Sequence, residues 1–282
     1  MTGHDPVTTV RKNADALARE RQRTGTAERL LGRDAAALYA PELDGARGDS
    51  LQTTELLFGA GNAVRDLCST VSARRAFISA LIEKTGLSET DLFPVPNRTE
   101  TRVLYARAGA ADRAYRLFSQ ILTDPRVGYA SSNVEAAEGV ESGDADLLLL
   151  PYADADGNRV ISTQTLSETH GLLLSALARV RVGDGLIYGL YGRAILPVPN
   201  ARLTLHLSIP SPDTETLAGL YGFAASCDLD ADGTVIPPDG GRASLSLSGK
   251  RADCLAAAVY SVAFCPGCEL RGLRAAQPLS ER

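Results

Sequence analysis

Alternation between apolar and polar residues is clearest in the last third of the chain. Residues 201–210 alternate with a period of two, which predicts a half-buried strand, and residues 214–226 carry apolar side chains at helical spacing. After a turn-rich span come a second strand, a second helix and a last short strand, at residues 242–248, 252–264 and 268–276. Together these segments predict the strand–helix–strand–strand–helix–strand order of a ferredoxin-like sandwich.

The N-terminal third predicts helices of two kinds. Residues 5–40 are rich in Ala, Arg and Glu and are polar nearly all round, which indicates a helix that is solvated or packed on a partner. Residues 51–85 carry a broad apolar stripe and predict one long buried helix, which we expect Gly59 and Gly61 to kink. Gly86 is the expected C-terminal stop.

The middle of the chain has the pattern of an α/β lobe, because short apolar runs alternate with helix-like segments. The predicted strands cover residues 101–106, 126–132, 145–152, 178–182 and 186–196, and the predicted helices cover 112–122, 133–142 and the centre of 160–174. The expected fold class is α+β. The expected division is a polar helical segment (1–50), a helical region (51–98), an α/β lobe (99–198) and the ferredoxin-like unit (199–282).

Composition and charge limit the classes of partner and the cellular compartment that we expect. A net charge of −5 does not suggest a nucleic-acid partner. No window reaches the roughly 18 uninterrupted apolar residues that a membrane helix needs, and the N-terminus has no apolar signal-peptide core. We therefore expect a cytoplasmic protein without nucleic-acid or membrane partners. Five cysteines, an odd number, argue against a disulfide framework.

Two motifs could hold a metal ion. Asp228, Asp230 and Asp232 precede a glycine as in the first half of a calcium loop, but a double proline follows and no helix does. Cys265 and Cys268 have redox-motif spacing, but a single CxxC pair is weak evidence for zinc. We interpret the first motif as a solvated turn and the second as buried thiols, and we expect no metal and no cofactor.

Three features of residues 101–196 occur together. A helix-like run over 134–146 ends in Val-Glu-Ser-Gly-Asp-Ala-Asp, Pro151 follows an apolar strand, and residues 163–166 read Thr-Gln-Thr-Leu. In these features the segment resembles the substrate-binding half of the prephenate dehydratase family. The resemblance implies half of a periplasmic-binding-protein-like core, a small carboxylate substrate and an ACT-type domain in the ferredoxin-like unit.

Departures from that family's pattern bear on the reaction. Its catalytic Thr-Arg-Phe triplet has no counterpart around residues 186–188, and Ala110 replaces the threonine of its Gly-rich turn. Prephenate decarboxylases of secondary metabolism also lack the triplet, and their Pro-containing loop is similar to residues 150–157. Decarboxylation requires little beyond carboxylate binding, desolvation and a proton donor. We therefore expect a prephenate-processing lyase, with decarboxylation favoured over dehydration.

A prephenate site needs cations and hydrogen-bond donors for two carboxylates. The expected substrate-binding residues are Arg107, Gly109, Ser131, Ser132, Asn133, Thr163 and Arg193. The helix start at Ser131 to Asn133 suits an anion. The expected catalytic residues are His170, as a proton donor, and Thr165.

Residues 72–87 permit a second comparison. They resemble the end of the first helix of an all-helical chorismate mutase, which implies that Arg74 or Arg75, with Lys84, holds the substrate carboxylates. The alternative is a packing or dimerisation helix. A third hypothesis is a non-catalytic amino-acid sensor or partner protein. In each case we expect a homodimer or higher oligomer, because an ACT-like sheet usually pairs with a second copy.

Overall fold

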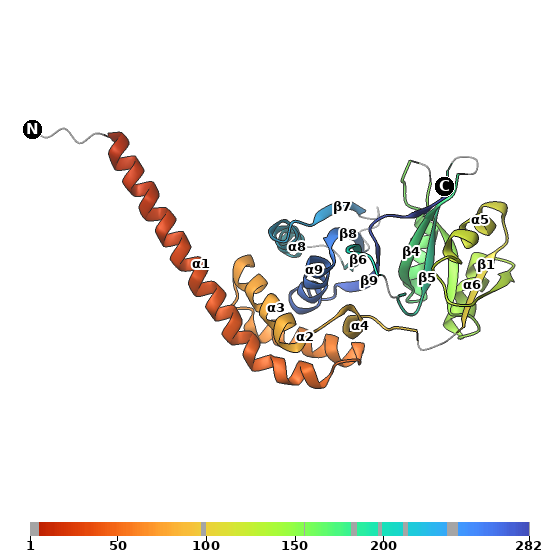
Figure 1. Cartoon of the computed structure of the whole chain (residues 1–282), viewed down its shortest axis with the longest axis horizontal. Helices are drawn as coiled ribbons and strands as arrows, with labels where there is room; N and C mark the ends of the chain where they lie inside the picture. The colour runs from red at the N-terminus through yellow and green to blue at the C-terminus, as the bar shows by residue number, and fades with distance from the viewer. Residues whose placement is uncertain are drawn as a thin grey trace, which may run out of the picture.

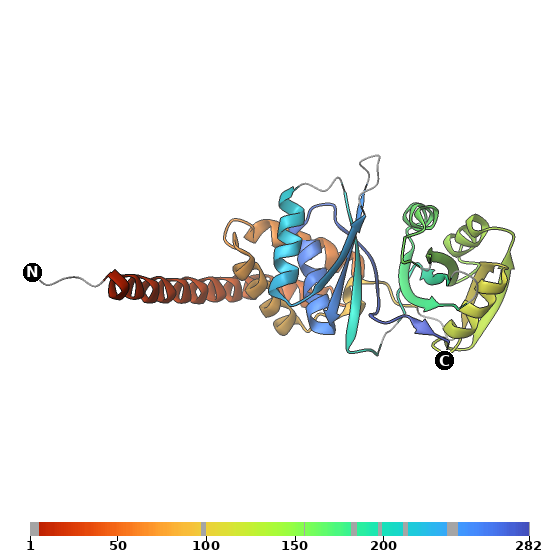
Figure 2. The same cartoon turned by 90° about the horizontal axis from the view of Figure 1, so that it is seen from above.

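The computed structural model describes residues 6–96, 100–154, 156–181, 185–196, 199–210, 214–235 and 242–281. Its helical N-terminal region consists of α1 (Pro6–Gly45), α2 (Ser50–Val64), α3 (Val71–Thr85) and the short α4 (Glu89–Leu92). Figures 1 and 2 show α1 as a long helix whose N-terminal part projects away from the rest of the molecule. No helix of the described residues is long and apolar enough to cross a membrane.

The prediction of one helix over residues 51–85 is wrong, because the chain breaks between α2 and α3. Gly59 and Gly61 lie inside α2 and do not end it. The break is instead specified by capping. The side chain of Asp49 accepts from the backbone N–H groups at the start of α2, and the side chain of Thr70 accepts from Ala73 N at the start of α3. Gly86 ends α3 in the left-handed conformation, as predicted.

The α/β lobe contains one half of a ten-stranded mixed sheet, in the order β2-β1-β3-β5-β4. Its strands are β1 (Thr101–Ala106), β2 (Pro125–Ala130), β3 (Leu147–Ala153), β4 (Leu173–Arg179) and β5 (Ile187–Gly192). Its helices are α5 (Gly109–Phe118), α6 (Asn133–Glu141) and α7 (Ile161–Thr169). Strands β1, β2 and β3 are parallel, whereas β5 runs antiparallel between β3 and β4. The predicted helix over 112–122 begins earlier, at Gly109, so that Asp112 lies in its first turn, where a carboxylate is stabilised.

The C-terminal unit has the predicted ferredoxin-like order. Its elements are β6 (Arg202–Ile209), α8 (Thr214–Ser226), β7 (Asp230–Val235), β8 (Ala243–Lys250), α9 (Arg251–Phe264) and β9 (Glu269–Ala275). The strands are antiparallel in the order β9-β6-β8-β7. Our interpretation of the acidic motif as a solvated turn is wrong in part, because Asp230 and Asp232 lie on β7 and pair with β8. The chain then returns to the lobe, where β10 (Leu279–Ser280) pairs with β4.

The buried apolar residues show how these parts pack. One cluster joins α1, α2 and α3 to the sheet and helices of the C-terminal unit, and it includes Phe77, Phe223 and Tyr260. Two further clusters cover the two faces of the lobe sheet, one under α5 and one under α6. The α+β class with a helical N-terminal region and mixed sheet is confirmed, whereas the four-part division of the chain stays a prediction.

Candidate functional site

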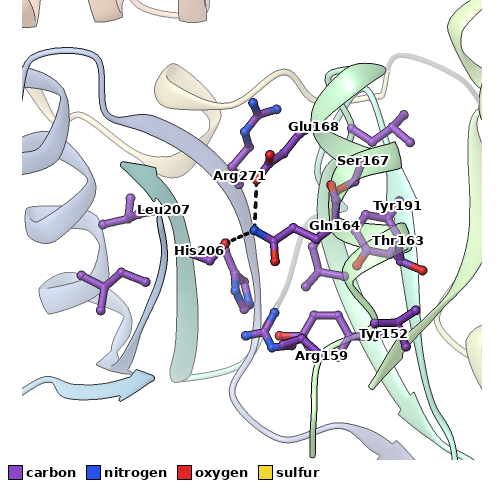
Figure 3. A pocket seen from close by; sticks show the side chains of 15 residues that line it. Tyr152, Arg159, Thr163, Gln164, Ser167, Glu168, Tyr191, His206, Leu207 and Arg271 are labelled. Carbon is purple, nitrogen blue, oxygen red and sulfur yellow. Dashed lines mark hydrogen bonds between the residues drawn. The ribbon is translucent and has the colours of Figure 1, made fainter. Parts of the chain in front are cut away.

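A small cavity lies between the lobe and the sheet of the C-terminal unit. Its volume is about 50 Å³, and its walls come from β3, α7 and β5 on one side and from β6, β8 and β9 on the other. Figure 3 shows polar side chains of both walls directed toward one another, among them Arg159, Gln164 and His206.

Two arginines bring positive charge to this junction. Arg159 precedes α7, and its guanidinium lies 4.1 Å from the centre of the Tyr152 ring and donates to Ser246 Oγ at 3.2 Å. Arg274, on β9, is buried and donates to His206 Nε2 at 2.9 Å and to the Ala275 carbonyl at 2.7 Å. Among the described residues, no ion pair involves either Arg159 or Arg274. Burial without a carboxylate partner is costly for a cation, and burial lowers the pKa of Arg274.

The bond from Arg274 determines the state of His206. Because Nε2 accepts from a guanidinium, the imidazole is neutral and its proton is on Nδ1, which lies 3.0 Å from Ser246 Oγ. Burial, together with the charges of Arg274 and Arg159, holds the pKa of His206 well below its usual value. His206 is therefore a fixed hydrogen-bonding group at neutral pH and carries no charge.

Helix α7 contributes one carboxylate side chain, Glu168, to the cavity wall. Gln164 Nε2 donates to Ser244 Oγ across the junction at 2.8 Å and to Glu168 Oε1 at 3.2 Å (Figure 3). Arg271 also lines the cavity; its Nη2 is paired with Glu269, whereas its buried Nε has no hydrogen-bond partner among the described residues. The site thus combines cationic donors with one carboxylate, that of Glu168. Cationic donors bind small anions, and carboxyl groups are among the side chains that serve as general acids or bases.

The predicted site residues lie in different places. Thr163 is buried in the cavity wall, whereas Thr165 is exposed on α7. His170, at the end of α7, makes a 2.6 Å contact between its Nδ1 and Glu141 Oε2. Arg193 donates to the Glu141 carbonyl at 3.3 Å, so His170 and Arg193 meet at the C-terminal end of α6.

The remaining predicted substrate-binding residues gather where β1 and β2 end, since Ala106 and Ala130 are parallel neighbours. The guanidinium of Arg107 lies 4.9 Å from the Tyr129 ring and 3.9 Å from Asp112 Oδ2. Gly109 and Asn133 begin α5 and α6, and the space around Gly109 is open.

The N-terminus of α6, which we expected to bind a substrate anion, already binds the carboxylate of Glu135 from the same helix. Glu135 Oε2 accepts from Ser131 N at 2.7 Å and from the Ser131 hydroxyl, while Ser132 Oγ accepts from Glu135 N at 3.1 Å. These hydrogen bonds from Ser131 lower the pKa of Glu135. A substrate carboxylate would have to displace this side chain.

The three residues of the mutase alternative lie on α3 but do not converge. Arg74 donates to the Cys68 carbonyl at 2.9 Å and packs over Phe264 at 5.0 Å. Arg75 donates to the Ser226 carbonyl and lines a groove of about 670 Å³ between α1 and α3. Lys84 is exposed.

The sequence did not lead us to Arg159, His206, Ser246 or Arg274. One signal was present in the strand pattern, because between the charged ends Arg202 and Lys250 the polar positions of β6 and β8 are Thr, Ser and His. Several of these side chains are buried, among them Thr204, His206, Ser208 and Ser246. Uncharged polar residues on a strand face can thus indicate a covered face.

Neither a protein-family model nor a curated protein sequence matches the chain. Among solved structures, GqqA, described as a novel type of quorum-quenching acylase, is 16% identical over 64% of this chain and 97% of its own, with a TM-score of 0.47. Prephenate dehydratase from Streptococcus mutans is 13% identical over 64% and 100%, with a TM-score of 0.47. The prephenate dehydratase from Arthrobacter aurescens, in complex with L-Phe, is 14% identical over 63% and 92%, with a TM-score of 0.45. These scores describe a distant likeness, which carries no conclusion about activity.

Proposed function

We propose that this chain is a lyase acting on prephenate or a closely related small dicarboxylate, and that the substrate binds at the cavity between the lobe and the C-terminal unit. The sequence run over residues 134–146 supports the substrate class. The observation that carries the location is Arg159, a cation in the cavity wall that has no ion-pair partner among the described residues. A carboxylate between the walls would supply the missing negative charge.

Each wall would have its own role in this reaction. Arg159 and the free Nε of Arg271 would bind a substrate carboxylate, and neutral His206 would keep Arg274 and Ser246 in place. Glu168 would protonate the leaving hydroxyl in a dehydration, or the ring carbon once carbon dioxide has left. Glu168 takes the role that we expected for His170, which contacts Glu141 instead.

The size of the cavity constrains the proposal. At about 50 Å³ it is far below the roughly 300–1,000 Å³ of typical ligand pockets. Binding a dicarboxylate therefore requires the walls to move apart. One residue pair, Leu174 with Gly272, joins β4 of the lobe to β9 of the C-terminal unit, and two further pairs join β10 to β4, so few backbone hydrogen bonds oppose that movement.

The test is turnover of prephenate by the purified chain, followed by ultraviolet absorbance and product mass. Arg159→Gln should reduce kcat/KM about tenfold to hundredfold, the value of one charge-assisted hydrogen bond. Arg107→Gln is the matched control, because Arg107 is an exposed arginine at the other predicted location. A loss of activity in Arg107→Gln, with normal activity in Arg159→Gln, would place the site at the ends of β1 and β2. The absence of turnover by the parent chain would contradict the lyase proposal.

A second candidate is the chorismate mutase alternative, favoured by one observation. Arg29 and Arg33 of α1 face Arg75 of α3 across the 670 Å³ groove, in which Glu83 is the only acid among the described lining residues. This groove has the volume and the charge for a dicarboxylate. Conversion of chorismate, reduced by Arg33→Gln and unchanged by Arg159→Gln, would support the helical half as the catalyst.

A further inference from the structure

The longest helix of the chain extends beyond anything that it packs against. At 1.5 Å per residue, the 40 residues of α1 span about 60 Å. Figures 1 and 2 show that its C-terminal part lies along α3, whereas its N-terminal part projects freely. A polar helix without tertiary contacts is only marginally stable in water. The projecting segment therefore needs a surface on which to pack.

The same chain carries an open groove beside the place where α1 meets α3. Small residues of α3, Ser72, Ala76 and Ser79, form one wall, and Leu30 and Arg33 of α1 form the other. Small side chains permit another helix to approach closely. Leu30 is 56% exposed there.

We propose that the projecting segment of α1 from a second copy of this chain lies along this groove, and that the contact is reciprocal about a two-fold axis. The occupant is a second copy because each chain has both halves of the contact: within the described part of the chain, the projecting helix has no surface to pack on and the groove has no helix that covers it. A two-fold axis satisfies both in each copy and closes the assembly at a dimer. The projecting helix, with more than a dozen residues ahead of Thr26, is long enough for the groove, since Ser72 to Glu83 spans about 16 Å of helix.

The close packing of α1 on α3 within one chain supports this geometry. A Cβ added to Gly32 would lie 2.7 Å from Phe77 N and 2.8 Å from the Ala73 carbonyl oxygen, so the two backbones nearly touch. The α3 surface next to this crossing is equally rich in small residues. It can accept a second helix in the same manner, and Leu30 then becomes buried between three helices.

The test is the mass in solution, measured by light scattering during size-exclusion chromatography at tens of micromolar. The expected mass is twice the chain mass of 29.7 kDa. Leu30→Lys should give the monomer mass, because it places a cation beside Arg29, Arg33 and Arg75. Leu38→Lys is the matched control on the same helix, because Leu38 is 74% exposed and does not line the groove. It should leave the dimer intact.

Deletion of residues 1–24 provides a second route that leaves the packed part of α1 in place. It should also give monomers, with the same thermal unfolding midpoint as Leu30→Lys. A monomeric parent chain would overturn the proposal. So would a dimer that persists in both the deletion and Leu30→Lys, or one that Leu38→Lys abolishes equally. None of these outcomes depends on either proposed activity.

Discussion

The C-terminal unit meets the rest of the chain on two sides, and the two junctions differ in chemistry. On its helical side, α9 packs against α2 and α3 within one apolar cluster. The rings of Phe77 and Phe264 meet edge to face, with their centres 6.1 Å apart. On its sheet side, the polar positions of β6 and β8 face the lobe across a cavity that contains Arg159 and His206.

The apolar junction stabilises the fold, whereas the polar junction contains the side chains that can bind a ligand. The apolar junction gains free energy from every side chain that it buries, at about 25 cal/mol per Å². The polar junction buries cations and hydroxyls whose desolvation offsets much of their mutual attraction. A permanent contact is thus expected on the helical side, and a contact that can open for a ligand on the sheet side.

The largest effect is expected from Gly61→Ala in the apolar junction. A Cβ there would lie 2.0 Å from the carbonyl oxygen of Ala263, so α2 and α9 must separate. We expect a loss of about 1–3 kcal/mol in the free energy of unfolding, measured in urea. Gly59→Ala is the control in the same helix, because nothing lies within 4 Å of its added Cβ, and it should stabilise by about 0.5–1 kcal/mol. Equal effects of the two substitutions would contradict this account of the junction.

The two junctions also differ in how far the sequence predicts them. The ferredoxin-like order follows from local patterns, because period-two and helical spacing are visible within each segment. The apolar face of α3 was visible in the same way, through Phe77, Ile78 and Leu81. The break between α2 and α3 was missed, because Asp49 and Thr70 specify it by capping bonds that an apolar stripe does not reveal.

The polar junction could not be predicted by the same reasoning. Arg159 and Ser246 are 87 positions apart, and His206 and Arg274 are 68 apart. Their contacts exist only because the lobe packs on the sheet of the C-terminal unit. Thr163 was the one predicted residue that lies in the cavity wall. Thr163 was predicted from its place after a turn, which is a local feature of the sequence. The contacts between side chains of the two units depend on the tertiary fold instead.

A smaller effect, confined to the polar junction, is expected from acidification. Burial and the nearby arginines depress the pKa of His206, so below its ordinary value of 6.5 the unfolded chain binds a proton that the folded chain does not. Stability therefore falls as pH decreases from 6.5 to 5, by up to about 1.4 kcal/mol per pH unit. Urea unfolding across this range should show the slope, and His206→Gln should remove it. His170→Gln, at the exposed contact with Glu141, should retain it. A wild-type slope of zero would refute the buried neutral imidazole.

The smallest effect is expected from chelators, which act on neither junction. Asp230 and Asp232 lie on an extended strand, where alternate side chains share a face but do not wrap around a central ion as calcium ligands do. Asp230 Oδ2 also lies 3.5 Å from Arg202 Nη2.

The cysteine pair leads to the same expectation. Burial raises the pKa of Cys268 to about 12, which disfavours the thiolate that zinc requires. Calorimetry with a calcium chelator or a zinc chelator should therefore shift the unfolding midpoint by less than about 1 °C, since only a metal bound to the folded state would stabilise it. The Gly61→Ala variant, measured alongside, shows that the assay detects a real loss. A fall of several degrees with either chelator would reveal a structural metal.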